Sequence, residues 1–138
     1  MRRIQEVCVT AALVFLCACT GRAIPPYLHL EAEFDTAKIS AVENIVRNVA
    51  RDWGLRVREK DKREMRFVSL GADAFFMSVY YENDTIVHVT NAGGVGASTL
   101  RLFASDYGKM PKAKLDDLIS DLVRGIETYD IKFRKIPI

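Results

Sequence analysis

An α+β fold is predicted for this chain: a mainly antiparallel sheet of four to five strands with two helices packed on one face. Three observations predict it. Polar and apolar residues alternate in several short segments, which is typical of strands with one buried face. Two longer segments carry apolar residues at helical spacing. Short turn-forming stretches separate the later strand segments, so we expect neighbouring strands to pair antiparallel.

The first two elements are a strand and a helix. Residues 28–34 alternate in polarity, and Asp35 or Thr36 is expected to cap a helix that runs to about Trp53. Gly54 then ends this helix, because glycine readily takes the left-handed conformation that follows a helix. The apolar residues of the helix fall on one side: Ile39, Val42, Ile45, Val46, Val49 and Trp53.

The remaining elements complete the order β-α-β-β-β-β-α. A strand over 55–60, with Leu55 and Val57 inward, leads through a polar turn to Met65–Leu70, and a break or bulge at 71–73 separates this segment from 75–81. Strands over 85–91 and 98–105 follow. The second helix is expected to begin near Pro111. Its buried stripe is Leu115, Leu118, Ile119, Leu122, Ile126 and Tyr129.

The N-terminal segment has a different character. Arg2 and Arg3 precede an apolar run from Val7 to Cys19, a pattern typical of a secretory signal peptide. This run is shorter than the ~20 residues of a transmembrane helix. Leu16-Cys17-Ala18-Cys19 resembles the lipobox of bacterial lipoproteins. The resemblance implies cleavage between Ala18 and Cys19, and a diacylglyceryl group with further acylation on Cys19. An ordinary secretory signal cleaved after Ala18 is the alternative.

These features divide the chain into three parts. Residues 1–18 are expected to be the signal peptide, 19–26 a lipidated tether, and 27–138 a single α+β domain. Pro25-Pro26 favours an extended backbone, so at ~3 Å per residue the tether holds the domain within about 25 Å of the lipid. In Gram-negative lipoproteins a residue other than Asp after the lipidated cysteine, here Thr20, resembles the outer-membrane class, which would face the periplasm.

Composition narrows the function classes. The three cysteines all lie at or before Cys19, so the mature domain forms no disulfide and depends on its apolar core. The formal net charge is +2, and the basic stretch 56–66 is interleaved with acids. A nucleic-acid partner is therefore not expected.

Candidate chemical motifs are weak. The glycine-rich stretch 93–96 has Ala97 where a phosphate-binding loop needs lysine. His29 and His88 would bind a metal only together with a carboxylate such as Glu31 or Glu82, and we expect no metal and no cofactor beyond the covalent lipid. Ser98 or Ser105, together with His88 and Asp106, would supply the residue types of a hydrolytic triad. No nucleophile-elbow pattern surrounds either serine. A non-enzymatic protein is the resulting expectation.

The second face of the sheet is the best candidate for a partner-binding surface. If Phe75, Met77, Val79 and Tyr81 lie under the helices, other side chains lie opposite them. Aromatic residues interleaved with arginine and histidine are typical of recognition surfaces. Two alternatives remain: the tail 131–138 covers this face, or the opposite strand phase exchanges the two faces. The predicted surface is Phe76, Tyr80, Ile86, His88, Arg101 and Phe103.

These observations favour a lipid-anchored envelope protein that acts by binding, as an accessory or a component of an assembly or secretion system. The architecture is similar to that of some envelope-assembly lipoproteins, including the partner of the outer-membrane lipopolysaccharide transporter, without any shared residue motif. A membrane-tethered immunity or inhibitor protein against a toxic enzyme is the alternative. A small hydrolase is the third hypothesis.

Overall fold

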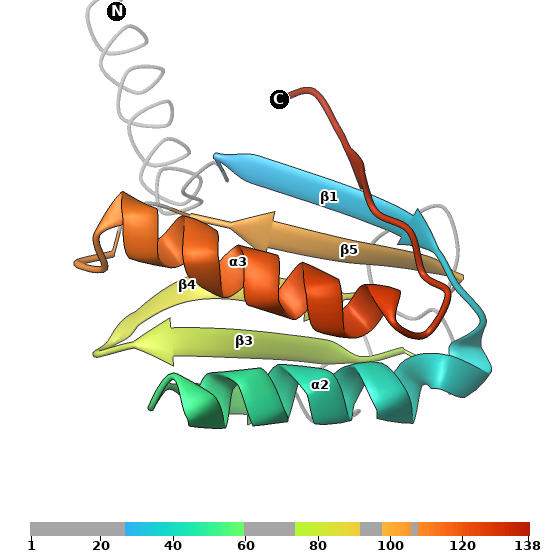
Figure 1. The fold of residues 1–138 in the computed structure, drawn as a ribbon, viewed down its shortest axis with the longest axis horizontal. Helices are drawn as coiled ribbons and strands as arrows, with labels where there is room; N and C mark the ends of the chain where they lie inside the picture. The colour runs from blue at the N-terminus through green and yellow to red at the C-terminus, as the bar shows by residue number, and fades with distance from the viewer. Residues whose placement is uncertain (1–26, 60–73, 92–97, 106–107) are drawn as a thin grey trace, which may run out of the picture.

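The computed structural model describes residues 27–59, 74–91, 98–105 and 108–138, and these form an α+β fold. Two helices lie side by side across one face of a six-stranded antiparallel sheet (Figure 1). The element order is β-α-β-β-β-β-α-β. The predicted class and the order of its first seven elements are confirmed, and a sixth strand is added at the C-terminal end.

The strand order within the sheet is β2-β3-β4-β5-β1-β6, and every neighbouring pair is antiparallel. The first strand therefore inserts between β5 and the last strand. The predicted segment 65–70, the glycine-rich stretch 93–96 and the whole of 1–26 lie outside the described residues. The strands are β1 (Leu28–Glu33), β2 (Arg56–Glu59), β3 (Phe76–Tyr81), β4 (Asp84–Thr90), β5 (Thr99–Ala104) and β6 (Arg134–Lys135).

The first helix forms close to where the sequence predicts it. The Asp35 carboxylate accepts a hydrogen bond from the Ala37 amide at 3.0 Å and caps a short 3₁₀ turn, η1 (Thr36–Lys38). The helix α2 (Ile39–Asp52) continues from it, with buried residues on one side only. Gly54 has a φ of +68°, the left-handed conformation expected after the helix.

The second helix, α3 (Lys112–Glu127), begins directly after Pro111. Its buried residues are five of the six that the sequence predicts: Leu115, Leu118, Ile119, Leu122 and Ile126. Tyr129 is 42% exposed, so its place in the buried stripe is wrong. The helix ends at Glu127, and Tyr129 therefore lies beyond the helical periodicity. Among the described residues, no helix combines the length and apolarity that a membrane span requires.

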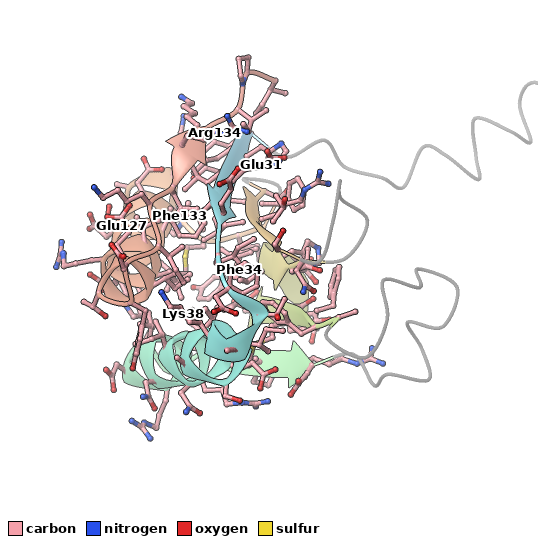
Figure 2. All side chains as sticks on the ribbon, turned by 90° about the vertical axis from the view of Figure 1, so that its right-hand side faces the viewer. Glu31, Phe34, Lys38, Glu127, Phe133 and Arg134 are labelled. Atoms are coloured by element: carbon pink, nitrogen blue, oxygen red, sulfur yellow. The ribbon has the colours of Figure 1, made fainter. Side chains whose placement is uncertain are left out.

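The helix-side face of the sheet holds the core. Met77, Val79, Val87, Val89 and the two leucines of β5 are fully buried there, and Leu55 and Val57 pack against the same cluster. The predicted strand phase is therefore confirmed. We call the other face, which lies away from α2 and α3, the distal face. Figure 2 shows the helices on one side of the strands and the distal face on the other.

Ile86 does not belong to the distal face, and this part of the predicted surface is wrong. Its side chain is 1% exposed and lies in the core cluster. The reason is an irregularity in the pairing of β3 with β4: Val79 pairs with Val87, whereas Tyr80 pairs with Thr85. Ile86 is the extra residue of this bulge, so simple alternation no longer assigns its direction.

The C-terminal tail lies at the edge of the sheet instead of across the distal face. Ile131 is fully buried and Phe133 packs against the core on the helix side. The next residues form β6, in which Arg134 pairs with Glu31, and the Ile136 amide donates to the His29 carbonyl at 2.9 Å. The interpretation that the tail covers the distal face is therefore contradicted.

Candidate functional site

The distal face is built from cross-strand rows, because residues paired in an antiparallel sheet project to the same side. The central row crosses five strands and consists of Arg58, Ser78, His88, Phe103 and His29. A second row lies beside it and consists of Phe76, Thr90, Arg101, Glu31 and Arg134. Arg56 and Tyr80 pair at one end of the face.

Aromatic and polar side chains contact each other along the central row. The His29 ring lies 4.4 Å from the Phe103 ring, with an interplanar angle of 32°. The His88 ring lies 5.0 Å from the ring of Phe76, which belongs to the second row. His88 Nδ1 is also 2.9 Å from Ser78 Oγ on the neighbouring strand. Each histidine ring thus contacts side chains of a neighbouring strand.

Glu31 is the hub of the charged part of the face. Its Oε1 lies 3.2 Å from His29 Nε2 and 3.3 Å from Arg101 Nε, and its Oε2 lies 3.6 Å from Arg134 Nη2. The Glu31 and Arg101 side chains are only 15% and 17% exposed. One half-buried carboxylate therefore joins three strands, β5, β1 and β6. Figure 2 shows Glu31 and Arg134 pointing toward one another.

The environment of His29 disfavours its charged form. Burial lowers the pKa of His29 below its usual value, and the neighbouring Arg101 guanidinium acts in the same direction. The Glu31 carboxylate opposes both effects without outweighing them. His29 is therefore neutral at neutral pH.

Arginines also mark the two outer strands. On β2, Arg56 Nη2 donates to the Glu82 carbonyl at 2.7 Å, and its guanidinium lies 5.9 Å from the centre of the Tyr80 ring. On β6, the Arg134 side chain is 76% exposed. The face thus has an aromatic centre with a guanidinium group at either edge.

Five of the six residues predicted for this surface share the distal face: Phe76, Tyr80, His88, Arg101 and Phe103. The prediction missed His29, Glu31, Ser78 and Arg134 as members of the same surface. The alternation of β1 places His29 and Glu31 away from the helices, but it does not reveal which strand lies beside them.

The positions of the two histidines bear on the hypotheses of a metal site and of a hydrolytic triad. Strand β5 separates β1 from β4, so Phe103 lies between His29 and His88. In the described ranges, no group of three or more histidine, cysteine or carboxylate side chains is placed to hold a metal ion. His88 Nδ1 contacts Ser78, which is 5% exposed. Asp106, the acid of the hypothetical hydrolytic triad, lies outside the described residues. A cross-strand hydrogen bond that satisfies a buried hydroxyl accounts for the Ser78–His88 pair.

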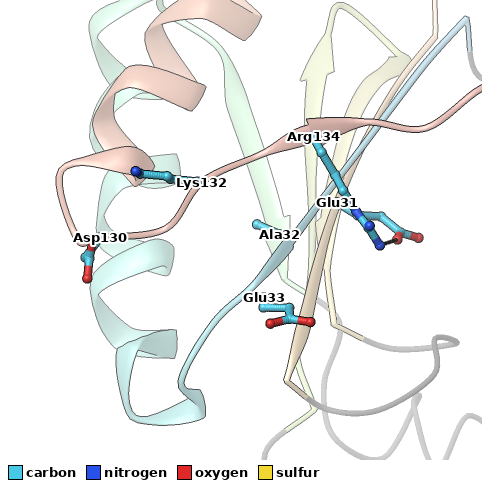
Figure 3. Close-up of a pocket in the computed structure, with 6 residues that line it drawn as sticks. All are labelled: Glu31, Ala32, Glu33, Asp130, Lys132 and Arg134. Atoms are coloured by element: carbon cyan, nitrogen blue, oxygen red, sulfur yellow. Dashed lines mark ion pairs between the residues drawn. The ribbon is translucent and has the colours of Figure 1, made fainter.

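A shallow hollow of about 450 Å³ adjoins this face at the end of β1. Figure 3 shows the chain after α3 crossing toward β1, with Asp130 and Lys132 on the helix side and the Glu31–Arg134 pair on the other side of the strand. The lining carries both charge signs: Glu31, Ala32, Glu33, Asp130, Lys132 and Arg134. Such a mixed lining does not select a ligand of one charge.

Comparison with known proteins gives no family for this chain. No protein-family model matches the sequence, and no curated protein is significantly similar to it.

Proposed function

We propose that this protein is a lipid-anchored component of the bacterial cell envelope that acts by binding a partner and has no enzymatic activity. The observation that carries the proposal is the sequence Leu16-Cys17-Ala18-Cys19 at the end of a short apolar run that follows Arg2-Arg3. Cys19 would hold the lipid. Thr20 favours the outer membrane, facing the periplasm, if the host is Gram-negative.

The start of the domain supports a short and defined attachment. Tyr27 contacts the first turns of α3. Its hydroxyl donates to Asp116 Oδ1 at 2.9 Å, and Lys112 Nζ lies 5.4 Å from the centre of its ring. The Tyr27 amide also donates to the Ala104 carbonyl at 3.0 Å. The tether 19–26 would therefore hold this end of the domain within about 25 Å of the lipid.

The distal face is the binding surface in this proposal. Aromatic residues and arginine are enriched at the centres of protein interfaces, because they bury a large area and pair with polar groups at the same time. Phe103, Tyr80 and Arg101 supply these groups on a sheet whose other face is filled by the helices.

The anchor is tested by mass spectrometry of the mature N-terminus together with membrane fractionation. We expect a triacylated or diacylated Cys19 as the first residue. Cys19→Ser should abolish lipid attachment, whereas the matched control Cys17→Ser should leave it unchanged. An unmodified Cys19, or a mature chain that begins elsewhere, would overturn the anchor.

The binding role is tested by photo-cross-linking in intact cells. A benzophenone amino acid at Tyr80 or Phe103 places the probe on the distal face, and Ser120 on the exposed side of α3 provides the control position. We expect a discrete adduct from the two distal positions and none from Ser120. If neither distal position gives an adduct while Cys19 is lipidated, the binding role of this face is wrong.

A further inference from the structure

The basic residues on the distal side of the described strands are all arginines. Four arginines lie on the distal side of the described strands, namely Arg56, Arg58, Arg101 and Arg134. The one lysine in these strands, Lys135, pairs with Leu30 and so lies on the helix side. The distal acids of the same strands are Glu31 and Glu33. The described strands thus give this face a formal net charge of +2, carried by guanidinium groups.

The positions of these arginines define a pattern. Arg56 and Arg58 belong to β2 and Arg134 belongs to β6, which are the two outer strands of the sheet. Five strand spacings separate them, or about 24 Å at ~4.8 Å each. Aromatic rings and the two histidines occupy the strands between them: Phe76, Tyr80, His88, Phe103 and His29. The strip between the two basic edges therefore combines aromatic rings with the Arg101–Glu31 ion pair.

Guanidinium groups are suited to pairing with carboxylates. Arginine presents five donors in a planar fork, is weakly hydrated and binds carboxylates with two parallel hydrogen bonds. Arg56 and Arg134 are both exposed. Arg56 uses Nη2 in its hydrogen bond to the Glu82 carbonyl, and Arg134 uses Nη2 in its ion pair with Glu31. An α-helix is about 10 Å across, so one fits on the strip between the two edges.

We propose that the partner of the distal face is a protein segment with an apolar stripe flanked by aspartate or glutamate, such as an acidic amphipathic helix. This inference rests on the proposed function, in which the distal face binds a protein. The apolar stripe packs on Phe103 and Tyr80. The carboxylates on its flanks pair with the arginines of β2 and with Arg134 of β6.

The test uses the mature lipidated protein, residues 19–138, in phosphatidylcholine nanodiscs and three fluorescent peptides of about 18 residues, or five helical turns. One peptide has a leucine stripe with glutamate flanks, the second has lysine in place of glutamate, and the third has alanine in place of leucine. Fluorescence anisotropy measures their affinities. We expect the first peptide to bind at least roughly tenfold more tightly than either of the others, and more weakly as salt is raised.

Matched charge reversals locate the binding on the protein. Arg56→Glu with Arg58→Glu should weaken binding of the acidic peptide by roughly tenfold or more, because like charges then face each other. Lys112→Glu with Lys114→Glu makes the same charge change on α3 and should leave the affinity unchanged. Arg134→Gln tests the opposite edge independently. Circular dichroism melts confirm that each variant is folded.

The remaining outcomes each overturn the inference. Equal binding of the acidic and basic peptides, no binding of the acidic peptide at about 1 mM, or equal loss in the α3 variant would exclude an acidic helical partner. Preferential binding of the protein to phosphatidylglycerol nanodiscs would assign the face to lipid. Self-association that the β2 variant abolishes would assign it to a second copy. In all these cases the cross-linking experiment above still decides the proposed function separately.

Discussion

Gly125 offers a sharp test of how the helix layer is packed. A Cβ atom at this position of α3 would lie 2.7 Å from Ile45 Cγ2 of α2. Contacts below 3.0 Å are essentially absent from proteins, so the two helices or the Ile45 side chain must shift. Gly125 is therefore the point that allows α2 and α3 to approach closely.

Two effects of Gly125→Ala oppose each other. Replacing glycine by alanine inside a helix normally stabilises it by about 0.5–1 kcal/mol. Overpacking a filled contact costs about 1–3 kcal/mol. The clash is the larger effect, so we expect a net destabilisation of about 1 kcal/mol, measured by urea unfolding with far-ultraviolet circular dichroism.

The Ile45→Ala background reverses the expected sign. This change removes Cγ2 and Cδ1, the two Ile45 atoms at 2.7 Å and 3.6 Å from the added Cβ. Only the helix-propensity gain then remains, so Gly125→Ala should stabilise this variant by about 0.5–1 kcal/mol. The coupling energy of the double-mutant cycle is therefore about 2 kcal/mol.

Ser120→Ala on the exposed side of α3 is the control and should change stability by less than ~0.5 kcal/mol. Stabilisation of the wild-type background by Gly125→Ala, or a coupling energy near zero, would refute the packing argument.

Three further predictions concern the sheet. Glu31→Gln removes the carboxylate charge that lies 3.3 Å from Arg101 Nε. It should lower the free energy of unfolding by about 1–3 kcal/mol, which urea titration measures. Asn91→Ala removes the buried Oδ1 that accepts from the Phe75 amide at 2.8 Å, so it should cost about 1–3 kcal/mol and accelerate hydrogen exchange at that amide. The pKa of His29 is lowered from 6.5 in the folded state, so the unfolded chain binds more protons just below pH 6.5 and stability falls as the pH decreases through this range. His29→Gln should flatten that part of the stability profile.

Each of these has a contradicting result. A loss for Glu31→Gln no larger than that for Glu33→Gln, at the exposed end of β1, would show that the carboxylate hub contributes nothing. Unchanged exchange at Phe75 in the Asn91 variant would remove the role assigned to its amide. A His29→Gln protein that loses stability with acid as steeply as the wild type would place the sensitive proton elsewhere.

Periodicity predicts most of this fold because each strand and helix has one buried side. Met77 and Val79 alternate with polar or half-exposed neighbours. Because two amphipathic helices must cover one face of the sheet, this alternation predicts that Met77 and Val79 face the helices. Ile86 shows where this reasoning ends. Its burial depends on the pairing of β4 with β3, and a bulge introduces an extra residue that alternation within one strand does not reveal.

The membership of the distal face depends on contacts between distant parts of the sequence. His29 meets Phe103 because β1 lies beside β5, and Glu31 meets Arg101 for the same reason. The polarity pattern of β1 shows which residues leave the core but does not specify its neighbour. The hub around Glu31 therefore emerges only from the strand order.

The path of the tail determines how the sheet meets a partner. Asp130, with a φ of +61°, redirects the chain after α3, and Ile131 then enters the core on the helix side. The tail consequently reaches the edge of β1 and pairs there, so it covers part of that edge instead of crossing the distal face. Charged side chains on an outer strand disfavour pairing between sheets, and β2 presents Arg56 and Arg58. Because one edge is occupied by β6 and the other is charged, we expect a partner to contact the distal face across the strands and not to extend the sheet.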